Sequence, residues 1–134
     1  NTVYTNVQIA TSIAPKPLLL ISNGNDWTKN NQSVEYPFAQ HVYALFGKQG
    51  QVELAHFPEE GHDYGKNKRM AAYKFLAKHL RLNLKKIQNE TGEISEAFVS
   101  LQPQNELKFF HENELDDVAK GDEIYRIFLA EKKK

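Results

Sequence analysis

The sequence contains no cysteine among its 134 residues. Disulfide bonds, thiolate nucleophiles and cysteine-based zinc sites are therefore excluded, although the missing cysteine does not fix the cellular compartment. Long hydrophobic runs are also missing. The longest apolar stretch, Pro17 to Ile21, is far shorter than the roughly 20 residues that a membrane-spanning helix needs. We therefore expect no membrane partner.

An excess of charge of either sign is likewise missing. The chain has 17 Lys and Arg against 17 Asp and Glu, so its formal net charge is zero. Because no overall field attracts a polyanion, we expect no nucleic-acid partner. A hydrophobic content of 40% in a chain of this length is typical of a single globular domain with its own core.

Two short segments of the sequence predict strands. Leu18 to Ile21 is a continuous apolar run, which is typical of a parallel strand covered by helices on both faces. A turn follows it at Asn23 to Asn25. Val52 to Phe57 predicts the second strand, because Pro58 and Gly61 interrupt the pattern behind it.

The segments around these strands have the spacing of helices. Residues 6 to 13 predict a short helix that is capped near Thr5 or Asn6. A second helix begins near Pro37 and stops at Gly47, and a third is capped at Asn67. The resulting order of strand, helix, strand and helix indicates an α/β fold.

The composition changes after Leu84. Residues 88 to 95 form a polar linker, and Ala97 to Leu101 is a brief apolar run that indicates a further strand. We therefore interpret residues 1 to 84 as the strand–helix–strand–helix part of one domain. Residues 85 to 134 are interpreted as a C-terminal extension that packs on the same domain.

The last part of this extension has the pattern of a helix. Ile124, Ile127 and Phe128 recur at helical spacing, and we expect them to face inward. Phe109 and Phe110 are also interpreted as core residues.

Asp26 and His62 are the candidate catalytic residues. Asp26 follows the first predicted strand, and His62 follows the second. The carboxyl ends of parallel strands meet at one sheet edge, and adjacent strands lie about 4.8 Å apart, so the two side chains should meet. Taken singly, each residue is more simply explained as a turn residue that binds local backbone. Together they form two thirds of an acyl-transfer triad, in which His62 moves the proton and Asp26 orients the imidazole.

Other candidate binding groups are weaker. His41 falls on a predicted helix and His56 inside a predicted strand, and neither belongs to a His-x-x-x-His pair. We expect no metal and no cofactor. Trp27, beside the acid, has two open interpretations: it stacks on a sugar ring, or it closes the core.

Three ordered motifs resemble the closing part of an α/β-hydrolase. They are Ala14-Pro15-Lys16-Pro17-Leu18-Leu19-Leu20, Asn25-Asp26-Trp27-Thr28 and Glu60-Gly61-His62-Asp63-Tyr64. Over residues 9 to 82 the chain is most similar to bacterial acetyl xylan esterase-like carbohydrate esterases, although Lys16 stands where that family often has Arg.

The resemblance implies a fold, an activity and a location. The fold would be a partial α/β-hydrolase, with three layers and a mostly parallel sheet, followed by a short extension. The family's acid maps to Asp26 and its histidine to His62, which implies a serine-type carboxylic ester hydrolase. The substrate would be a small ester or an acylated carbohydrate, and a periplasmic or secreted parent protein is favoured.

The nucleophile of that family is missing from the sequence. Its Gly-x-Ser-x-Gly turn occurs nowhere, and Ser22 has Leu20 where the first glycine should stand. In the family the serine precedes the acid and the histidine, so the resemblance places it upstream of Asn1. We therefore expect the C-terminal portion of a longer esterase that is inactive by itself. The exposed edge of its first strand should self-associate or pair with the missing part.

A second interpretation stays open. As the alternative to an enzyme part, the chain is a non-catalytic, hydrolase-like module that binds a ligand or another chain at its sheet edge.

Overall fold

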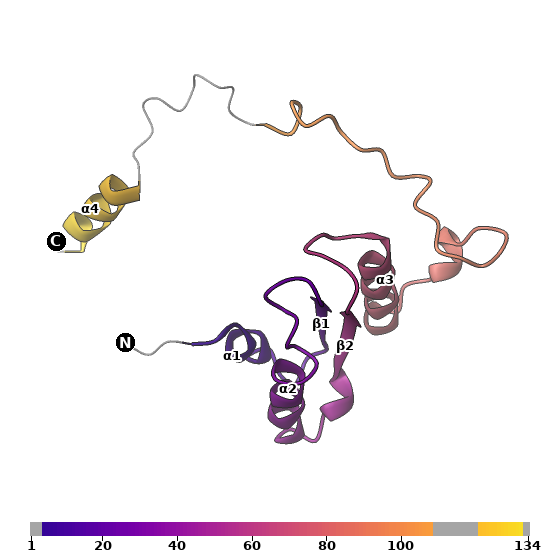
Figure 1. The fold of residues 1–134 in the computed structure, drawn as a ribbon, viewed down its shortest axis with the longest axis horizontal. Coiled ribbons are helices and arrows are strands. Elements are labelled where there is room, and N and C mark those ends of the chain that lie inside the picture. The colour runs from indigo at the N-terminus through magenta and orange to yellow at the C-terminus, as the bar shows by residue number, and fades with distance from the viewer. Residues whose placement is uncertain (1–3, 109–120, 133–134) are drawn as a thin grey trace. The chain divides into compact units, whose positions relative to one another are not determined.

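The computed structural model describes residues 4 to 108 and 121 to 132. Phe109 and Phe110, which the sequence places in the core, lie outside these described ranges. The chain divides after Glu96 into a first and a second unit, and each unit is described by itself. The elements of both units are labelled in Figure 1.

Two parallel strands form the centre of the first unit: β1 (Leu18–Asn23) and β2 (Val52–Phe57). They pair in register from Leu18 opposite Val52 to Asn23 opposite Phe57. Both lie on the apolar segments that predicted them, so the two strand predictions are confirmed. Because the strands are parallel, their carboxyl ends meet at one edge, and the segment that follows each end begins there.

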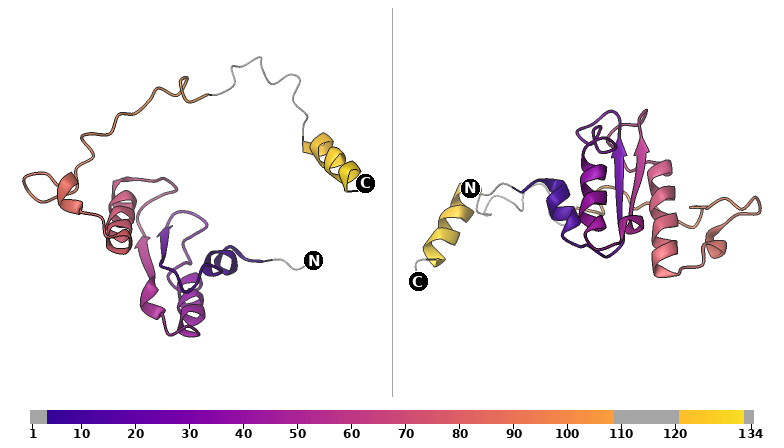
Figure 2. Two further views of the ribbon diagram at one scale, coloured as in Figure 1. Left: turned by 180° about the vertical axis from the view of Figure 1, so that it is seen from behind. Right: turned by 90° about the horizontal axis from the view of Figure 1, so that it is seen from below.

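Helices connect and cover the two strands. α1 (Asn6–Thr11) precedes β1, α2 (Glu35–Ala44) and the 3-10 turn η1 (Gln49–Gln51) connect β1 to β2, and α3 (Lys66–Leu80) follows β2. Figure 2 shows α1 and α2 on one side of the strands and α3 on the other. The first unit is therefore a partial α/β fold. A three-layer domain with a larger parallel sheet stays a prediction.

The core of the first unit lies between α2 and the strands. Ala39 and Tyr43 of α2 are fully buried, and Val52 at the start of β2 is almost as well covered. The Tyr43 hydroxyl donates a hydrogen bond of 2.5 Å to the carbonyl oxygen of Lys16, just before β1. The helix is therefore attached to the segments that lead into both strands.

Two predicted helix ends are confirmed. Thr5 caps α1, because its hydroxyl accepts from the N–H of Gln8 while the Gln8 side chain accepts from the N–H of Thr5. Gly47 has a φ of +63°, a left-handed conformation that glycine adopts without steric cost. Its N–H donates to the carbonyl of Ala44, the last residue of α2. Gly47 therefore ends α2 as predicted, through its left-handed backbone conformation and its N–H.

The predicted cap at Asn67 is wrong. α3 begins at Lys66, and Gly65 occupies the cap position. The reason lies in the preceding turn, where the carboxylate of Asp63 accepts a hydrogen bond from the Gly65 N–H and ends the loop early. The Asn67 amide instead donates to the carboxylate of Glu60 at 2.6 Å.

The first unit continues past α3. The chain forms a 3-10 turn, η2 (Leu84–Ile87), and then returns to α3. There Glu96 accepts two hydrogen bonds of 2.7 Å from the guanidinium of Arg69. Residues up to Glu96 therefore belong with the first unit. The packing of residues 85 to 134 as one extension on this domain stays a prediction.

The strand predicted at Ala97–Leu101 is wrong. This run contains a turn and no strand. Phe98 is 72% exposed and Leu101 88% exposed, so the run buries too little apolar surface to hold strand geometry.

The last predicted helix is confirmed as α4 (Gly121–Glu131), but its inward face is not. Ile124, Ile127 and Phe128 are each more than half exposed. The sequence pattern of an amphipathic helix is present. Among the described residues of the second unit, however, there is no second helix or strand on which that stripe could pack.

Candidate functional site

The two loops that follow β1 and β2 are held against each other by backbone contacts. The N–H of Gly24 donates to the carbonyl of Phe57 at 3.0 Å, and the N–H of Asn25 donates to the carbonyl of Glu60 at 3.3 Å. A Cβ atom on Gly24 would lie only 1.7 Å from the carbonyl oxygen of Pro58. This close approach requires glycine, and it places the segment after β1 beside the segment after β2.

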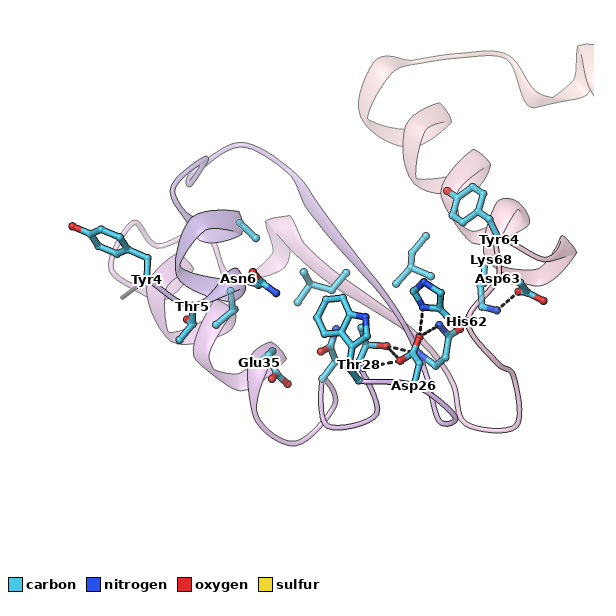
Figure 3. Close-up of a pocket in the computed structure, with 17 residues that line it drawn as sticks. Tyr4, Thr5, Asn6, Asp26, Thr28, Glu35, His62, Asp63, Tyr64 and Lys68 are labelled. Atoms are coloured by element: carbon cyan, nitrogen blue, oxygen red, sulfur yellow. Dashed lines mark hydrogen bonds and ion pairs between the residues drawn. The ribbon is translucent and has the colours of Figure 1, made fainter. Parts of the chain in front are cut away.

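Asp26 and His62 meet across these loops, as Figure 3 shows. The Nδ1 atom of His62 lies 3.0 Å from Oδ2 of Asp26. The acid is almost completely covered, with 5% of its side chain exposed, whereas the histidine side chain is 74% exposed. The structure therefore brings together the two residues that the strand order predicted to meet.

The roles within this hydrogen bond follow from the chemistry of the two groups. An ionised carboxylate only accepts hydrogen bonds, so Nδ1 of His62 must carry the hydrogen. The opposite ring nitrogen, Nε2, is then the proton-accepting position of the neutral imidazole. An acid that fixes the tautomer and a ring that presents Nε2 make up a general base.

Asp26 is held in its ionised form by its neighbours. Thr28 donates two hydrogen bonds to Oδ1, at 2.5 Å from its hydroxyl and 2.6 Å from its N–H. The amide of Asn23 donates to Oδ2 at 2.6 Å. The Thr28 hydroxyl and these further hydrogen bonds lower the pKa of Asp26 well below its ordinary range, although burial acts in the opposite direction. The acid therefore stays charged at neutral pH.

Lys68 anchors the loop that carries His62. Its side chain is 1% exposed, and its Nζ donates to the carbonyl of Gly61 at 2.9 Å and to the carboxylate of Asp63. It also forms an ion pair of 3.1 Å with Glu60. Burial acts to lower the pKa of Lys68, but the hydrogen bonds to the two carboxylates raise it, so the ammonium form is retained.

Sequence reasoning missed Thr28, Asn23 and Lys68. Thr28 and Asn23 are ordinary turn residues by type, and nothing in their spacing marks them as partners of the acid. Lys68 had a usable signal, because two carboxylates flank the histidine and a lysine follows on the next helix. Two carboxylates, Glu60 and Asp63, that shortly precede a lysine on a helix favour a cluster of ion pairs.

A cavity of about 700 Å³ lies beside the pair. Its wall includes Asp26, His62 and the aromatic residues Trp27 and Tyr64. Trp27 is 69% exposed, so it does not close the core of the first unit. A cavity with an apolar wall and a few polar groups at one end has the character of a small-molecule site.

Ser22 does not supply a nucleophile to this cavity. Its side chain is fully buried, and its hydroxyl lies 2.7 Å from Nδ1 of His56 on the paired strand. This is a cross-strand contact inside the sheet. The serine is therefore engaged in packing the two strands together.

No group of three or more His, Cys, Asp or Glu in the described residues is arranged to hold a metal ion. None of the helices that the structure describes has both the length and the apolar content required to cross a bilayer.

Comparison with known proteins gives one informative likeness. No protein-family model matches the sequence, and no curated protein matches it. A solved structure, methylesterase BT1017, is similar with a TM-score of 0.61 and 36% sequence identity. The match covers 67% of this chain and 20% of that one, so the chain spans about a fifth of that protein's length. The likeness supports an esterase-like hydrolase fold.

Proposed function

We propose that this chain supplies the acid and the general base of a serine ester hydrolase. The observation that carries the proposal is the 3.0 Å hydrogen bond between His62 and a buried, charge-stabilised Asp26. The likeness to a methylesterase, which extends over 67% of this chain at 36% identity, supports an esterase-type hydrolase independently. The finer assignment to acetyl xylan esterase-like carbohydrate esterases belongs to the same proposal.

The proposed chemistry uses Nε2 of His62. It takes the proton from a serine hydroxyl while the serine oxygen attacks the ester carbonyl carbon. The resulting imidazolium returns that proton to the departing alcohol, which leaves an acyl-serine. Water then repeats the sequence and releases the acid. Asp26 stabilises the imidazolium in both halves through its hydrogen bond to Nδ1.

The serine itself is proposed to lie outside these 134 residues. The sequence has no Gly-x-Ser-x-Gly turn, and the best-placed serine, Ser22, is buried against His56. The solved neighbour is about five times as long as the part that matches this chain. By itself the chain should therefore show no esterase activity.

The substrate is proposed to be a small ester or an acylated carbohydrate. Trp27 and Tyr64 are exposed aromatic residues on the wall of the cavity that contains the pair. Such aromatic faces suit the apolar side of a sugar ring. Acetyl and methyl esters both fit this chemistry: an acetyl ester leaves an acetyl-serine and releases its alcohol, whereas a methyl ester leaves its own acyl group on the serine and releases methanol.

Turnover by the complete gene product tests the proposal. The protein that contains this chain would be assayed on an acetyl and a methyl ester, with Asp26→Asn and His62→Ala as variants. We expect Asp26→Asn to lose about 10⁴-fold in kcat, and His62→Ala, which removes the general base itself, to lose about 10⁶-fold. The control is His41→Ala, which removes an exposed histidine on α2 and should leave turnover unchanged. Near wild-type turnover by both variants of the pair would end the proposal.

A non-catalytic module is the second candidate. It is favoured by the free edge of β1, which pairs only with β2 among the described residues. An unpaired parallel edge accepts a further strand. In this case the chain should self-associate or bind another chain, and light scattering that finds only monomer at high concentration would count against it.

A further inference from the structure

We infer that Lys68 is a positioning residue for His62: its buried ammonium fixes the backbone on both sides of the histidine and so sets the imidazole against Asp26. The inference rests on the proposed function, because it assigns a role in preparing the same general base. It concerns a residue of α3 that touches neither Asp26 nor His62 in any described hydrogen bond.

The ammonium of Lys68 has all of its donors occupied. A lysine ammonium carries three N–H donors, and three acceptors surround it: the carbonyl of Gly61 and the carboxylates of Glu60 and Asp63. Burying a charge in this way costs free energy unless it is paired and hydrogen-bonded. A fully satisfied buried ammonium therefore holds its three acceptors in one arrangement.

These acceptors bracket the histidine in the chain. Glu60 and Gly61 precede His62 directly, and Asp63 follows it. The histidine side chain is 74% exposed, so packing does not hold it in place. No atom lies within 4 Å of the position of a Cβ on Gly61, which leaves that backbone without a steric wall. The ammonium provides the constraint that packing does not.

The neighbouring helix residue supports the same loop from its far end. Arg69 donates from Nη1 to the carbonyl of Tyr64 at 2.7 Å. The first turn of α3 thus contacts both ends of the segment from Glu60 to Tyr64. The carboxylates of Glu60 and Asp63 offset the positive charge of Lys68. Lys68 therefore acts on the imidazole of His62 by fixing the backbone of the loop, and not through the electrostatic field of its charge.

The test reads the tautomer of His62 by ¹⁵N NMR of the imidazole in the 134-residue chain, at alkaline pH where the ring is neutral. In wild type we expect the Nδ1-protonated tautomer, which the bond to Asp26 requires. In Lys68→Met we expect a shift toward the mixture of a free imidazole, as in the reference variant Asp26→Asn. Lys68→Arg, which keeps the charge, should recover part of the wild-type signal.

The matched control is Lys78→Met on the same helix. Lys78 also binds a carboxylate, Glu53, at 2.6 Å, but it is 61% exposed and does not contact the histidine loop. It should leave the His62 tautomer unchanged. A folded Lys68→Met protein with the wild-type tautomer would overturn the inference.

A second variant keeps the inference falsifiable if Lys68→Met does not fold. Asp63→Ala removes one of the three acceptors at a side chain that is 66% exposed, so the fold should survive. It should move the tautomer in the same direction by a smaller amount, and no movement would overturn the inference. These NMR experiments do not measure turnover. An unchanged tautomer would therefore overturn the role of Lys68 without contradicting the proposed function, which only the ester assays test.

Discussion

The hydroxyl of Thr28 links Asn23 to Asp26. It accepts a hydrogen bond of 2.9 Å from the N–H of Asn23 and donates one of 2.5 Å to Oδ1 of Asp26. The hydroxyl oxygen of Thr28 thus connects the carboxylate of Asp26 to the backbone of Asn23, the last residue of β1. The position of Asp26 is thus set by the end of the strand and not by a free loop.

Replacing this hydroxyl should weaken the acid's environment. In Thr28→Val the pKa of Asp26 should rise toward its ordinary value of 3.8. Because the folded carboxyl has the lower pKa, its contribution to stability is present above pH 3.8 and is lost as the pH falls below that value. The difference in unfolding free energy between wild type and Thr28→Val should therefore shrink in acid.

Urea unfolding at neutral and at strongly acidic pH measures that difference. Thr28→Ser keeps the hydroxyl and is the matched control, with a smaller loss at both pH values. A loss for Thr28→Val that is identical at both pH values would show that Asp26 is not involved.

Gly24→Ala should separate the two loops. The added Cβ would lie 1.7 Å from the carbonyl oxygen of Pro58, so the backbone must move. Overpacking of this kind costs about 1–3 kcal/mol, measured by chemical denaturation. Gly50→Ala is the control, because no atom lies within 4 Å of its Cβ position, and its stability should change little. Equal stability of the two variants would contradict the close approach.

Glu96 should contribute stability that disappears in acid. Its hydrogen bonds from Arg69, and then from Tyr73, lower the pKa of Glu96 from 4.5 to about 2. A carboxyl whose pKa is lower in the folded state stabilises the protein above pH 4.5, and this contribution is lost as the pH falls through about 2. Glu96→Gln should therefore destabilise the chain at pH 7 and have less effect near pH 2.

Thermal unfolding at these two pH values checks the Glu96 prediction. Glu90→Gln, at an exposed position in the neighbouring turn, is the control and should match wild type at both. A Glu96→Gln protein as stable as wild type at pH 7 would mean that this ion pair does not hold the segment.

The sequence was sufficient for β1 and β2 and for the meeting of Asp26 with His62, since parallel topology alone brings their loops to one edge. It was not sufficient for the supporting groups. Lys68 and Thr28 act through hydrogen bonds to particular neighbours, and such contacts leave no periodic signal in the sequence. The cap at Asn67 failed because a turn closed by Asp63 ended the loop first.

The most direct test of the central claim is a double-mutant cycle on ester turnover in the complete protein. If Asp26 and His62 act as one unit, the double variant Asp26→Asn/His62→Ala should be no slower than His62→Ala alone. Losses in kcat that multiply between the two single variants would contradict the account, because they would mean that the carboxylate and the imidazole act independently.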